Sequence, residues 1–335
     1  MEFIAECDKH MLPTELCNIK YSLPLINSYV IEVSNNISKL KKIKSINALY
    51  PNKTIDTQMN IVRDKVKCIN TKYTGKGISI AFIDTGICKN NDFDSRIKCF
   101  YDVVNHKNYV YDDCGHGTHV AGICSGSGAN SNGKYRGIAP ESNIVMIKAL
   151  DFEGKGTASD VLTGIQWVAD NYKKYNIRIL NMSIGAGITN TKDPLVRAAE
   201  ILWDMGIVVV AAAGNNGPQK GTISSPGISK KIITVGSVDD INVPENDIGK
   251  SYSGRGPTKE CVIKPDVVAP GTNIISCLCE DNKNNNYYKS LSGTSMSTPI
   301  VSGAIALLLE KAPNLKPDDI KFMLKQSCHN LECSP

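Results

Sequence analysis

The chain has 335 residues, and its composition of 41% hydrophobic and 21% charged residues excludes wholesale disorder and collagen-like repeats. A formal net charge of +5, from 38 basic and 33 acidic residues, is too mild to indicate a nucleic-acid partner. No apolar stretch approaches the roughly 18 to 20 residues of a membrane-spanning helix, so we expect no membrane association. The start, MEFIAECDKHMLPTEL, lacks the basic-then-apolar layout of a secretory signal, which favours a cytoplasmic protein.

The twelve cysteines are scattered along the chain, and only Cys277 and Cys279 are close together. Neither the cysteine density of a small disulfide scaffold nor a C-x-x-C zinc pattern is present. We therefore expect free thiols in a reducing cytoplasm.

The first sixty or so residues predict a small α+β unit. Residues 27–34 and 47–55 have the composition of strands, and residues 35–46 have that of an amphipathic basic helix. Four lysines give this helix either a solvated face, the simpler interpretation, or a contact for an acidic partner. They are Lys39, Lys41, Lys42 and Lys44.

From about residue 76 onward, short apolar runs alternate with helical patterns. Strands are predicted over residues 77–84, 143–150, 177–183, 206–214 and 231–237. Helices are predicted over residues 157–175 and 193–206, where apolar residues recur at helical spacing. Continuous apolar strands separated by helices indicate a parallel sheet covered on both faces. The predicted fold class is α/β for residues 63–335, preceded by a separate unit of residues 1–62.

The segment IAFIDTGI, residues 80–87, places Asp84 at the end of an apolar strand, before Thr85 and Gly86. A turn-forming Asp-Thr-Gly is one interpretation. The Asp-Thr-Gly of aspartic proteases is another, but that chemistry needs two carboxylates sharing a proton. The chain has no second Asp-Thr-Gly or Asp-Ser-Gly, so this alternative is weak.

The segment DDCGHGTHVAGI, residues 112–123, holds His116 and His119 three positions apart between glycines. A zinc pair with Cys114 as a third ligand is one alternative. No further ligand cluster completes such a site, and the apolar residues that follow predict instead that His116 opens a buried helix.

Polar side chains also follow a later strand. VVVAAAGNNGP, residues 208–218, is an apolar strand that ends in small residues and then Asn215. An amide at the carboxyl edge of a parallel sheet lies where ligands bind in such sheets. Asn-Asn-Gly is also simply a good turn.

The segment SLSGTSMSTPI, residues 290–300, leads into an apolar run with helical spacing. Ser295 stands at the predicted helix start, where unpaired N–H groups and the positive end of the helix dipole favour an anion. Its hydroxyl could attack a carbonyl while its own N–H holds the resulting oxyanion. An ordinary Ser cap is the alternative. The G-x-S-x-G elbow of α/β-hydrolases does not fit, because position 297 is Ser.

Asp84, His116 and Ser295 follow one another in the chain order acid, histidine, serine, which is that of subtilisin. The blocks DTGI, GHGTHVAG, NMSIGAG, AAAGNNG and GTSMSTP match the signature blocks of the subtilisin family of serine proteases in order and spacing. The sequence therefore resembles that family from about residue 70 to the end. Its connecting segments look most like the intracellular alkaline protease branch.

The resemblance implies a three-layer fold and a catalytic triad. Ser295 would be the nucleophile, His116 the base that takes its proton, and Asp84 the group that orients the imidazole. Asn215 would donate its side-chain amide to the oxyanion, together with the backbone N–H of Ser295.

The same resemblance implies the substrate-binding residues. An extended peptide would add as a strand to one edge, and a side-chain pocket would lie between two walls with Ser224 near its floor. The strand edge is Ser183, Ile184 and Gly185, and the opposite wall is Ala211, Ala212, Ala213 and Gly214. A second substrate-lining segment contains Gly154, Gly156 and Ala158, whose small size suggests a roomy site. In the turn SSPG, we predict a cis bond between Ser225 and Pro226.

The sequence also departs from the family. Many relatives bind calcium through the loop after the histidine block, but here that loop, CSGSGANSNGKYRG, has no carboxylate. We therefore expect folding that does not depend on calcium, with no cofactor required for catalysis. The N-terminal unit resembles a shortened pro-region that chaperones folding and inhibits the active site, and we expect self-cleavage near residues 50–65. Cys114 could confer sensitivity to thiol reagents, unless it is simply buried.

The prediction is a serine endopeptidase that acts on peptides or proteins. One alternative is a catalytically silent relative that only binds peptides or regulates partners. Another is metal-dependent hydrolysis through His116 and His119, which chelators would abolish.

Overall fold

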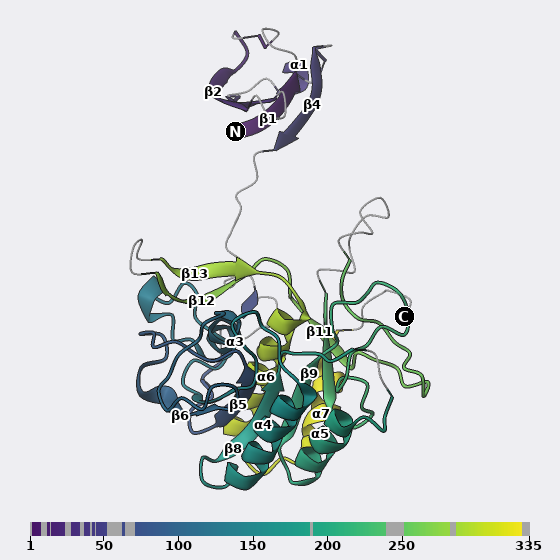
Figure 1. Ribbon diagram of the computed structural model, residues 1–335. Coiled ribbons are helices and arrows are strands. Elements are labelled where there is room, and N and C mark those ends of the chain that lie inside the picture. The colour runs from purple at the N-terminus through teal and green to yellow at the C-terminus, as the bar shows by residue number, and fades with distance from the viewer. Residues whose placement is uncertain are drawn as a thin grey trace. The chain divides into compact units, whose positions relative to one another are not determined.

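The computed structural model places the chain in two compact units, Met1–Asp56 and Thr57–Pro335. The residues that it describes are 2–7, 12–13, 15–23, 28–33, 37–40, 42–43, 45–51, 62–63, 71–187, 190–238, 251–281 and 286–329. Figure 1 shows the elements of both units.

The first unit is an antiparallel sheet in the order β2-β3-β1-β4. Its elements are β1 (Glu2–Cys7), β2 (Asn18–Leu23), β3 (Ser28–Glu32), α1 (Ile37–Leu40) and β4 (Ile46–Pro51). Side chains on one face, among them Phe3, Ala5 and Ile31, pack with Leu40 into a small core. The predicted strands at 27–34 and 47–55 correspond to β3 and β4. The predicted helix over 35–46 is wrong in length, because β4 begins at Ile46 to pair with β1. Lys41 and Lys44 of the lysine cluster lie outside the described residues.

The second unit is built on a seven-stranded parallel sheet in the order β11-β10-β9-β8-β5-β7-β6. Its strands are β5 (Ser79–Asp84), β6 (Ile97–Asp102), β7 (Asn143–Lys148), β8 (Ile177–Met182), β9 (Val208–Ala212), β10 (Ile233–Ser237) and β11 (Val267–Ala269). The five predicted strands correspond to β5, β7, β8, β9 and β10. Every residue of β5 and β9 is buried, which explains why these strands are continuously apolar.

Helices cover both faces of this sheet, as the α/β prediction required. They are α3 (His116–Ser125), α4 (Ala158–Asn171), α5 (Pro194–Asp204), α6 (Thr294–Lys311) and α7 (Pro317–Ser327), with short 3₁₀ turns η2 (Asp94–Arg96) and η3 (Ala129–Ser131). In Figure 1, α4 and α5 lie together in front of the sheet, while α3 and α6 pack against each other on the other face. The predicted three-layer architecture is confirmed.

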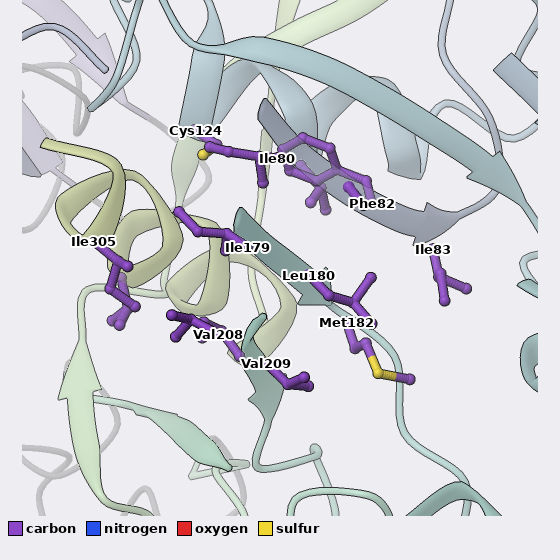
Figure 2. Close-up of a cluster of buried hydrophobic side chains, with 14 of the residues drawn as sticks. Ile80, Phe82, Ile83, Cys124, Ile179, Leu180, Met182, Val208, Val209 and Ile305 are labelled. Atoms are coloured by element: carbon purple, nitrogen blue, oxygen red, sulfur yellow. The ribbon is translucent and has the colours of Figure 1, made fainter. Parts of the chain in front are cut away.

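The side chains of the central strands alternate between the two layers. On β5, Ile80 and Phe82 share one face, and Figure 2 shows Ile80 beside Cys124 of α3. Ile83 points to the opposite face, where its Cδ1 lies 3.5 Å from the position that a Cβ would take on Gly164 of α4. The sheet is thus held in a core that extends on both sides and fixes where its carboxyl edge lies.

Two further features surround that edge. The antiparallel hairpin of β12 (Ile274–Asp281) and β13 (Asn286–Leu291) leads directly into α6. The bond between Ser225 and Pro226 is cis, as predicted.

Within the described part of the chain, no helix is both long and apolar enough to cross a membrane.

Candidate active site

The carboxylate of Asp84 and the imidazole of His116 meet at the carboxyl edge of the sheet. Asp84 is the last residue of β5, and His116 is the first residue of α3. The two atoms Asp84 Oδ1 and His116 Nδ1 are 2.7 Å apart. The backbone N–H of Thr85 also donates to Asp84 Oδ1 at 2.8 Å, and Asp84 is completely buried. This carboxylate therefore fixes the orientation of the ring and selects the tautomer with its proton on Nδ1.

The charge of Asp84 also changes the acidity of His116. Burial lowers the pKa of the imidazole, because a low dielectric disfavours the charged ring. The nearby charge of Asp84 and the hydrogen bond to it outweigh that effect, so the pKa of His116 is raised above its ordinary value. The arrangement stabilises an imidazolium, which is what a base needs after taking a proton.

The hydroxyls around Ser295 have different partners. Ser297 Oγ donates to the carbonyl of Ala269, and Thr298 Oγ1 donates to the carbonyl of Thr294. Ser292 Oγ accepts from the backbone N–H of Asn273, just before β12. Ser295 lies in the first turn of α6, and it lines the same cleft as His116. The neighbouring hydroxyls thus satisfy backbone groups, while Ser295 borders the space in which a substrate would lie.

The backbone of Ser295 is anchored to the strand β8. Ser183 Oγ donates to the carbonyl of Ser295 at 2.8 Å and accepts from Asn181 Nδ2 at 2.9 Å. Asn181 Oδ1 in turn accepts from Ser302 Oγ in the next turns of α6 at 2.8 Å. This buried polar chain sets the position of the start of α6 relative to the sheet.

Asn215 follows β9 and is held by Thr294. Both the backbone N–H and the hydroxyl of Thr294 donate to Asn215 Oδ1 at 3.0 Å. A Cβ on Gly293 would come within 3.3 Å of Asn215 Nδ2, so the glycine lets the amide approach the chain just before Ser295. Because Oδ1 is occupied, the orientation of the amide is fixed, with Nδ2 as its donor.

A cleft of about 550 Å³ collects most of the predicted substrate-binding residues. Ser183, Ile184 and Gly185 line one side of it, and Gly154, Gly156 and Ala158 line another. The segment around Ala158, at the start of α4, is exposed to solvent. Sequence reasoning did not single out several further lining residues, among them the apolar Leu150, Val161, Met182 and Leu195 and the charged Glu153 and Lys155.

The remaining predicted residues surround Ser224, outside the lining of that cleft. A Cβ on Gly214 would lie 2.1 Å from Ser224 Oγ, and one on Gly185 would lie 2.9 Å from its Cβ. Only glycine therefore allows both walls to approach Ser224 so closely. Ala211 and Ala212 end β9, and Ala213 accepts the backbone N–H of Ser224 at 2.9 Å. The two predicted walls thus meet at Ser224, which is almost fully buried.

His119 is separated from this chemistry. It is completely buried, and its Nε2 is 3.0 Å from the carbonyl of Lys289 on β13. Burial lowers its pKa to about 3, so the ring is neutral and Nε2 donates. Nδ1 of His116 faces Asp84, and the described residues contain no group of three or more His, Cys, Asp or Glu that could hold a metal. These contacts disfavour the zinc alternative.

The calcium site of the family does not fit the residues present after the histidine block. The carboxylate next to that loop belongs to Asp92, which is buried. Its oxygens accept from the backbone N–H groups of Gly128 and Asn130, from the hydroxyl of Tyr288 at 2.8 Å and from the thiol of Cys277 at 3.3 Å. Four protein donors thus use the lone pairs that a hard cation would require.

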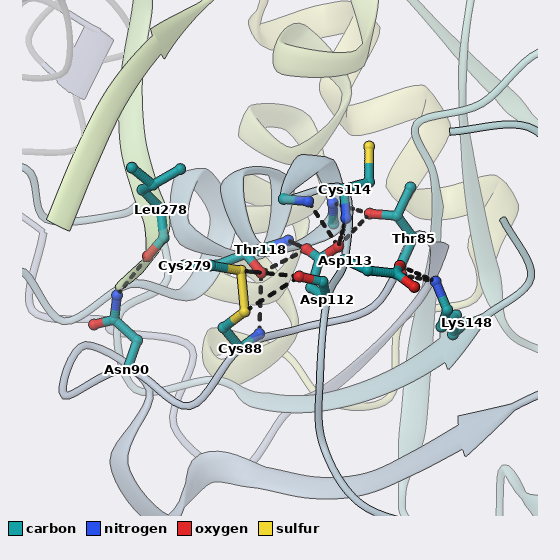
Figure 3. The surroundings of a disulfide bond; sticks show 12 residues. Thr85, Cys88, Asn90, Asp112, Asp113, Cys114, Thr118, Lys148, Leu278 and Cys279 are labelled. Atoms are coloured by element: carbon teal, nitrogen blue, oxygen red, sulfur yellow. Dashed lines mark hydrogen bonds and ion pairs between the residues drawn. A yellow bond between two sulfur atoms is a disulfide. The ribbon is translucent and has the colours of Figure 1, made fainter. Parts of the chain in front are cut away.

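The expectation of free thiols is wrong for two cysteines. Cys88, just after β5, and Cys279, on β12, form a disulfide with an S–S distance of 1.99 Å (Figure 3). They are 191 positions apart, so their proximity arises from the tertiary fold and has no trace in the local sequence. Cys114 is a free, half-buried thiol that lines the cleft beside His116.

Three charged side chains beside the site were not singled out from the sequence. Lys148 ends β7 with a fully buried side chain, and its Nζ donates to the carbonyl of Thr85 at 2.7 Å and to Asp113 Oδ1 at 2.6 Å. The carboxylate of Asp112 also contacts Thr85, at 2.9 Å. For Asp112 and Asp113, the signal available in the sequence was their position as the pair of acids that opens DDCGHGTHVAGI.

A parallel sheet that pairs Asp84 with His116, and that brings His116 and the start of a buried helix to one cleft, defines a subtilisin-like protein. Comparisons agree: residues 75–333 match the peptidase S8 model, described as the subtilase family. The serine protease AprX of Bacillus subtilis is 42% identical over 328 residues, which cover 92% of this chain and 73% of that protein. Subtilisin DY of Bacillus licheniformis is 35% identical, covering 81% and 90%.

Solved structures show the same likeness. A cold-adapted subtilisin-like serine proteinase aligns with a TM-score of 0.63 at 34% identity, covering 77% of this chain and 84% of that one. Sphericase aligns with a TM-score of 0.69 at 28% identity, covering 82% and 91%. The chain belongs to the subtilase family and is a serine endopeptidase.

Proposed function

We propose that the protein cleaves peptide bonds through a triad of Asp84, His116 and Ser295. The observation that carries the proposal is the 2.7 Å contact between His116 Nδ1 and Asp84 Oδ1, with His116 and Ser295 lining one cleft. His116 accepts the proton of Ser295 Oγ as this atom attacks the scissile carbonyl, and Asp84 stabilises the imidazolium that forms. His116 then protonates the leaving amine, and water repeats the sequence to release the acyl group.

The oxyanion of the tetrahedral intermediate would be held by two donors, Asn215 Nδ2 and the backbone N–H of Ser295. The second donor lies at the N-terminus of α6, an 18-residue helix whose dipole favours a negative charge at that point. Donors that are held in place before the reaction need no reorganisation when the charge develops. Thr294 supplies that restraint for Asn215.

The substrate would bind as an added strand along Ser183, Ile184 and Gly185. Its side chain before the cleaved bond would enter the space between the walls at Gly185 and Gly214, with Ser224 at the end. Gly185, Gly214 and Ser224 carry no charge, so we propose a preference for a neutral substrate residue before the cleaved bond. Further upstream, the small Ala158 leaves room for a larger substrate side chain.

The N-terminal unit, predicted from the sequence as residues 1–62, would act as a pro-region that chaperones folding, inhibits the enzyme and is then removed by self-cleavage near residues 50–65. The support is its separate core and its independent sheet. Much of the proposed cleavage segment lies outside the described residues.

The decisive comparison is between wild type, Ser295→Ala and Ser290→Ala, because Ser290 is an exposed residue of β13 in the same segment. Peptide hydrolysis and labelling by a serine-directed phosphonate should be lost only in Ser295→Ala. Intact mass should show removal of the N-terminal unit in wild type and Ser290→Ala, and retention in Ser295→Ala. Equal hydrolysis by all three proteins would disprove the triad, whereas inhibition by chelators would favour metal-dependent hydrolysis.

A further inference from the structure

The carboxylate of Asp112 accepts five hydrogen bonds next to the proposed triad (Figure 3). Oδ1 accepts from Thr85 Oγ1 at 2.9 Å and from the backbone N–H groups of Gly115 at 2.8 Å and Cys114 at 3.2 Å. Oδ2 accepts from the backbone N–H of Thr118 at 2.9 Å and from its hydroxyl at 2.6 Å. Asp112 itself is 92% buried, since only 8% of it is exposed.

These five bonds join the two elements that deliver Asp84 and His116. Thr85 directly follows Asp84, and Thr118 lies in the first turn of α3, which begins at His116. The hydroxyl of Thr85 has one hydrogen, which it donates in the hydrogen bond to Asp112. The lone pairs of Thr85 Oγ1 are therefore free for the backbone N–H of Gly117, which donates to it at 2.8 Å.

We propose, on the basis of the triad proposed above, that Asp112 is a positioning residue that holds His116 in register with Asp84 through Thr85 and Thr118. Asp112 borders neither the cleft nor the reacting atoms, so it acts only through its neighbours. Its charge makes these hydrogen bonds stronger than neutral ones, and burial shields them from competing water. Figure 3 shows Asp112 between Thr85 and Thr118.

The charges that face His116 give this proposal a second readout. Asp84 faces the ring from β5, Asp112 from the segment before α3, Lys289 from β13, and His119 from α3 itself. The negative charge of Asp112 raises the pKa of His116, whereas the positive charge of Lys289 lowers it. His119 is neutral at the relevant pH because its own pKa is about 3.

The direction of each expected change follows from the role of His116. A base must be unprotonated, so kcat/KM falls as the pH drops through the pKa of His116 in the free enzyme. The acid limb of the profile is the range in which kcat/KM falls as the pH drops. Removal of the negative charge in Asp112→Asn destabilises the imidazolium and shifts this acid limb to lower pH. Removal of the positive charge in Lys289→Gln shifts it to higher pH.

The experiment measures kcat/KM against pH for a substrate that does not ionise in that range. Asp112→Asn should lower kcat at least tenfold, because its Nδ2 cannot accept the backbone N–H of Thr118, and should move the acid limb to lower pH. The matched control is Asp170→Asn, an exposed residue on α4, for which both quantities should equal those of wild type. A kcat within twofold of wild type with an unmoved limb in Asp112→Asn overturns the proposal.

Two more variants separate position from charge and decide the matter if Asp112→Asn does not fold. Thr85→Val removes the hydroxyl and keeps every charge, so kcat should fall at least severalfold with the acid limb unmoved, and Thr85→Ser should restore it. Full activity in Thr85→Val contradicts the positioning role. Failure of the proposed triad can be told apart from failure of the role proposed for Asp112. In the first case, wild type itself would show no hydrolysis that depends on Ser295.

Discussion

Thr294 donates both its backbone N–H and its hydroxyl to Asn215 Oδ1, each at 3.0 Å. The residue before the proposed nucleophile therefore fixes the amide that follows β9. Two segments that are about 80 positions apart in the chain are locked together at the point where an oxyanion would form.

Asn215→Ala is expected to lower kcat by about 10² to 10³, the magnitude known from subtilisin, with little change in KM. In the proposed site this donor would contact the oxyanion only in the transition state, so its loss should lower kcat and leave KM nearly unchanged. Thr294→Val keeps the backbone donor to Oδ1 and should lose less activity than Asn215→Ala. Steady-state kinetics on one peptide substrate measure both effects. A kcat for Asn215→Ala equal to that of wild type would remove Asn215 from the oxyanion site.

Reduction of Cys88–Cys279 is expected to destabilise the catalytic unit by roughly 2 to 4 kcal/mol, because the bond closes a very long loop. Thermal unfolding with and without a dithiol reductant measures this change, and Cys88→Ser should match the reduced wild type. A reductant effect that persists in Cys88→Ser would assign the loss to another cause. A thiol count on protein taken from its own cells also tests the predicted cytoplasmic location, where free thiols are expected and disulfides are rare.

Alkylation of Cys114 is expected to block peptide hydrolysis, since its thiol lines the cleft beside His116. The buried thiols should not react, because burial raises the pKa of Cys124 to about 12 and also raises that of Cys277. Activity after treatment with iodoacetamide, together with peptide mapping, measures the effect. Cys114→Ser should be resistant to the reagent. Modification of Cys114 without loss of activity would mean that the thiol does not obstruct the bound substrate.

Asp266→Asn is expected to destabilise the protein by about 3 to 5 kcal/mol, because it leaves the fully buried ammonium of Lys264, 2.6 Å from Asp266 Oδ2, without its counter-charge. Chemical denaturation measures the change. The matched control is Lys325→Gln, which removes a half-exposed partner of the same carboxylate, and for which we expect about 0 to 1 kcal/mol. Equal losses of stability in the two variants would contradict the larger contribution expected from the buried Lys264–Asp266 pair.

The same carboxylate gives an acid dependence of stability. Burial raises the pKa of Asp266, but the charges of Lys264 and Lys321 outweigh burial, so that the folded-state pKa lies below the ordinary value. The ionised group therefore contributes its full stability above its unfolded pKa of about 3.9 and loses it as the pH falls through the lower folded value. Denaturation measured between pH 5 and pH 2 should show this loss in wild type and a smaller one in Asp266→Asn.

Much of the architecture was predictable from the sequence. The central strands are continuously apolar because both of their faces are buried, and the helices between them show the spacing of a covered layer. The failure at residues 35–46 has the same origin: an amphipathic pattern favoured a helix, but pairing of Ile46 and its neighbours with β1 ended α1 at Leu40. Local periodicity does not reveal which segment will complete a sheet.

The site was predictable only in part. Asp84, His116, Asn215 and Ser295 stand in motifs whose order and spacing identify them, so the family and the candidate reagents can be predicted without a structure. The groups that hold those reagents in place are found only in the folded chain. Cys88 meets Cys279, Thr294 meets Asn215, and Asp112 meets Thr85, although none of these pairs is adjacent in the chain. Hydrogen bonds and disulfides depend on distances of a few ångströms, which are set when the sheet and helices pack and leave no periodic signal in the residues that form them.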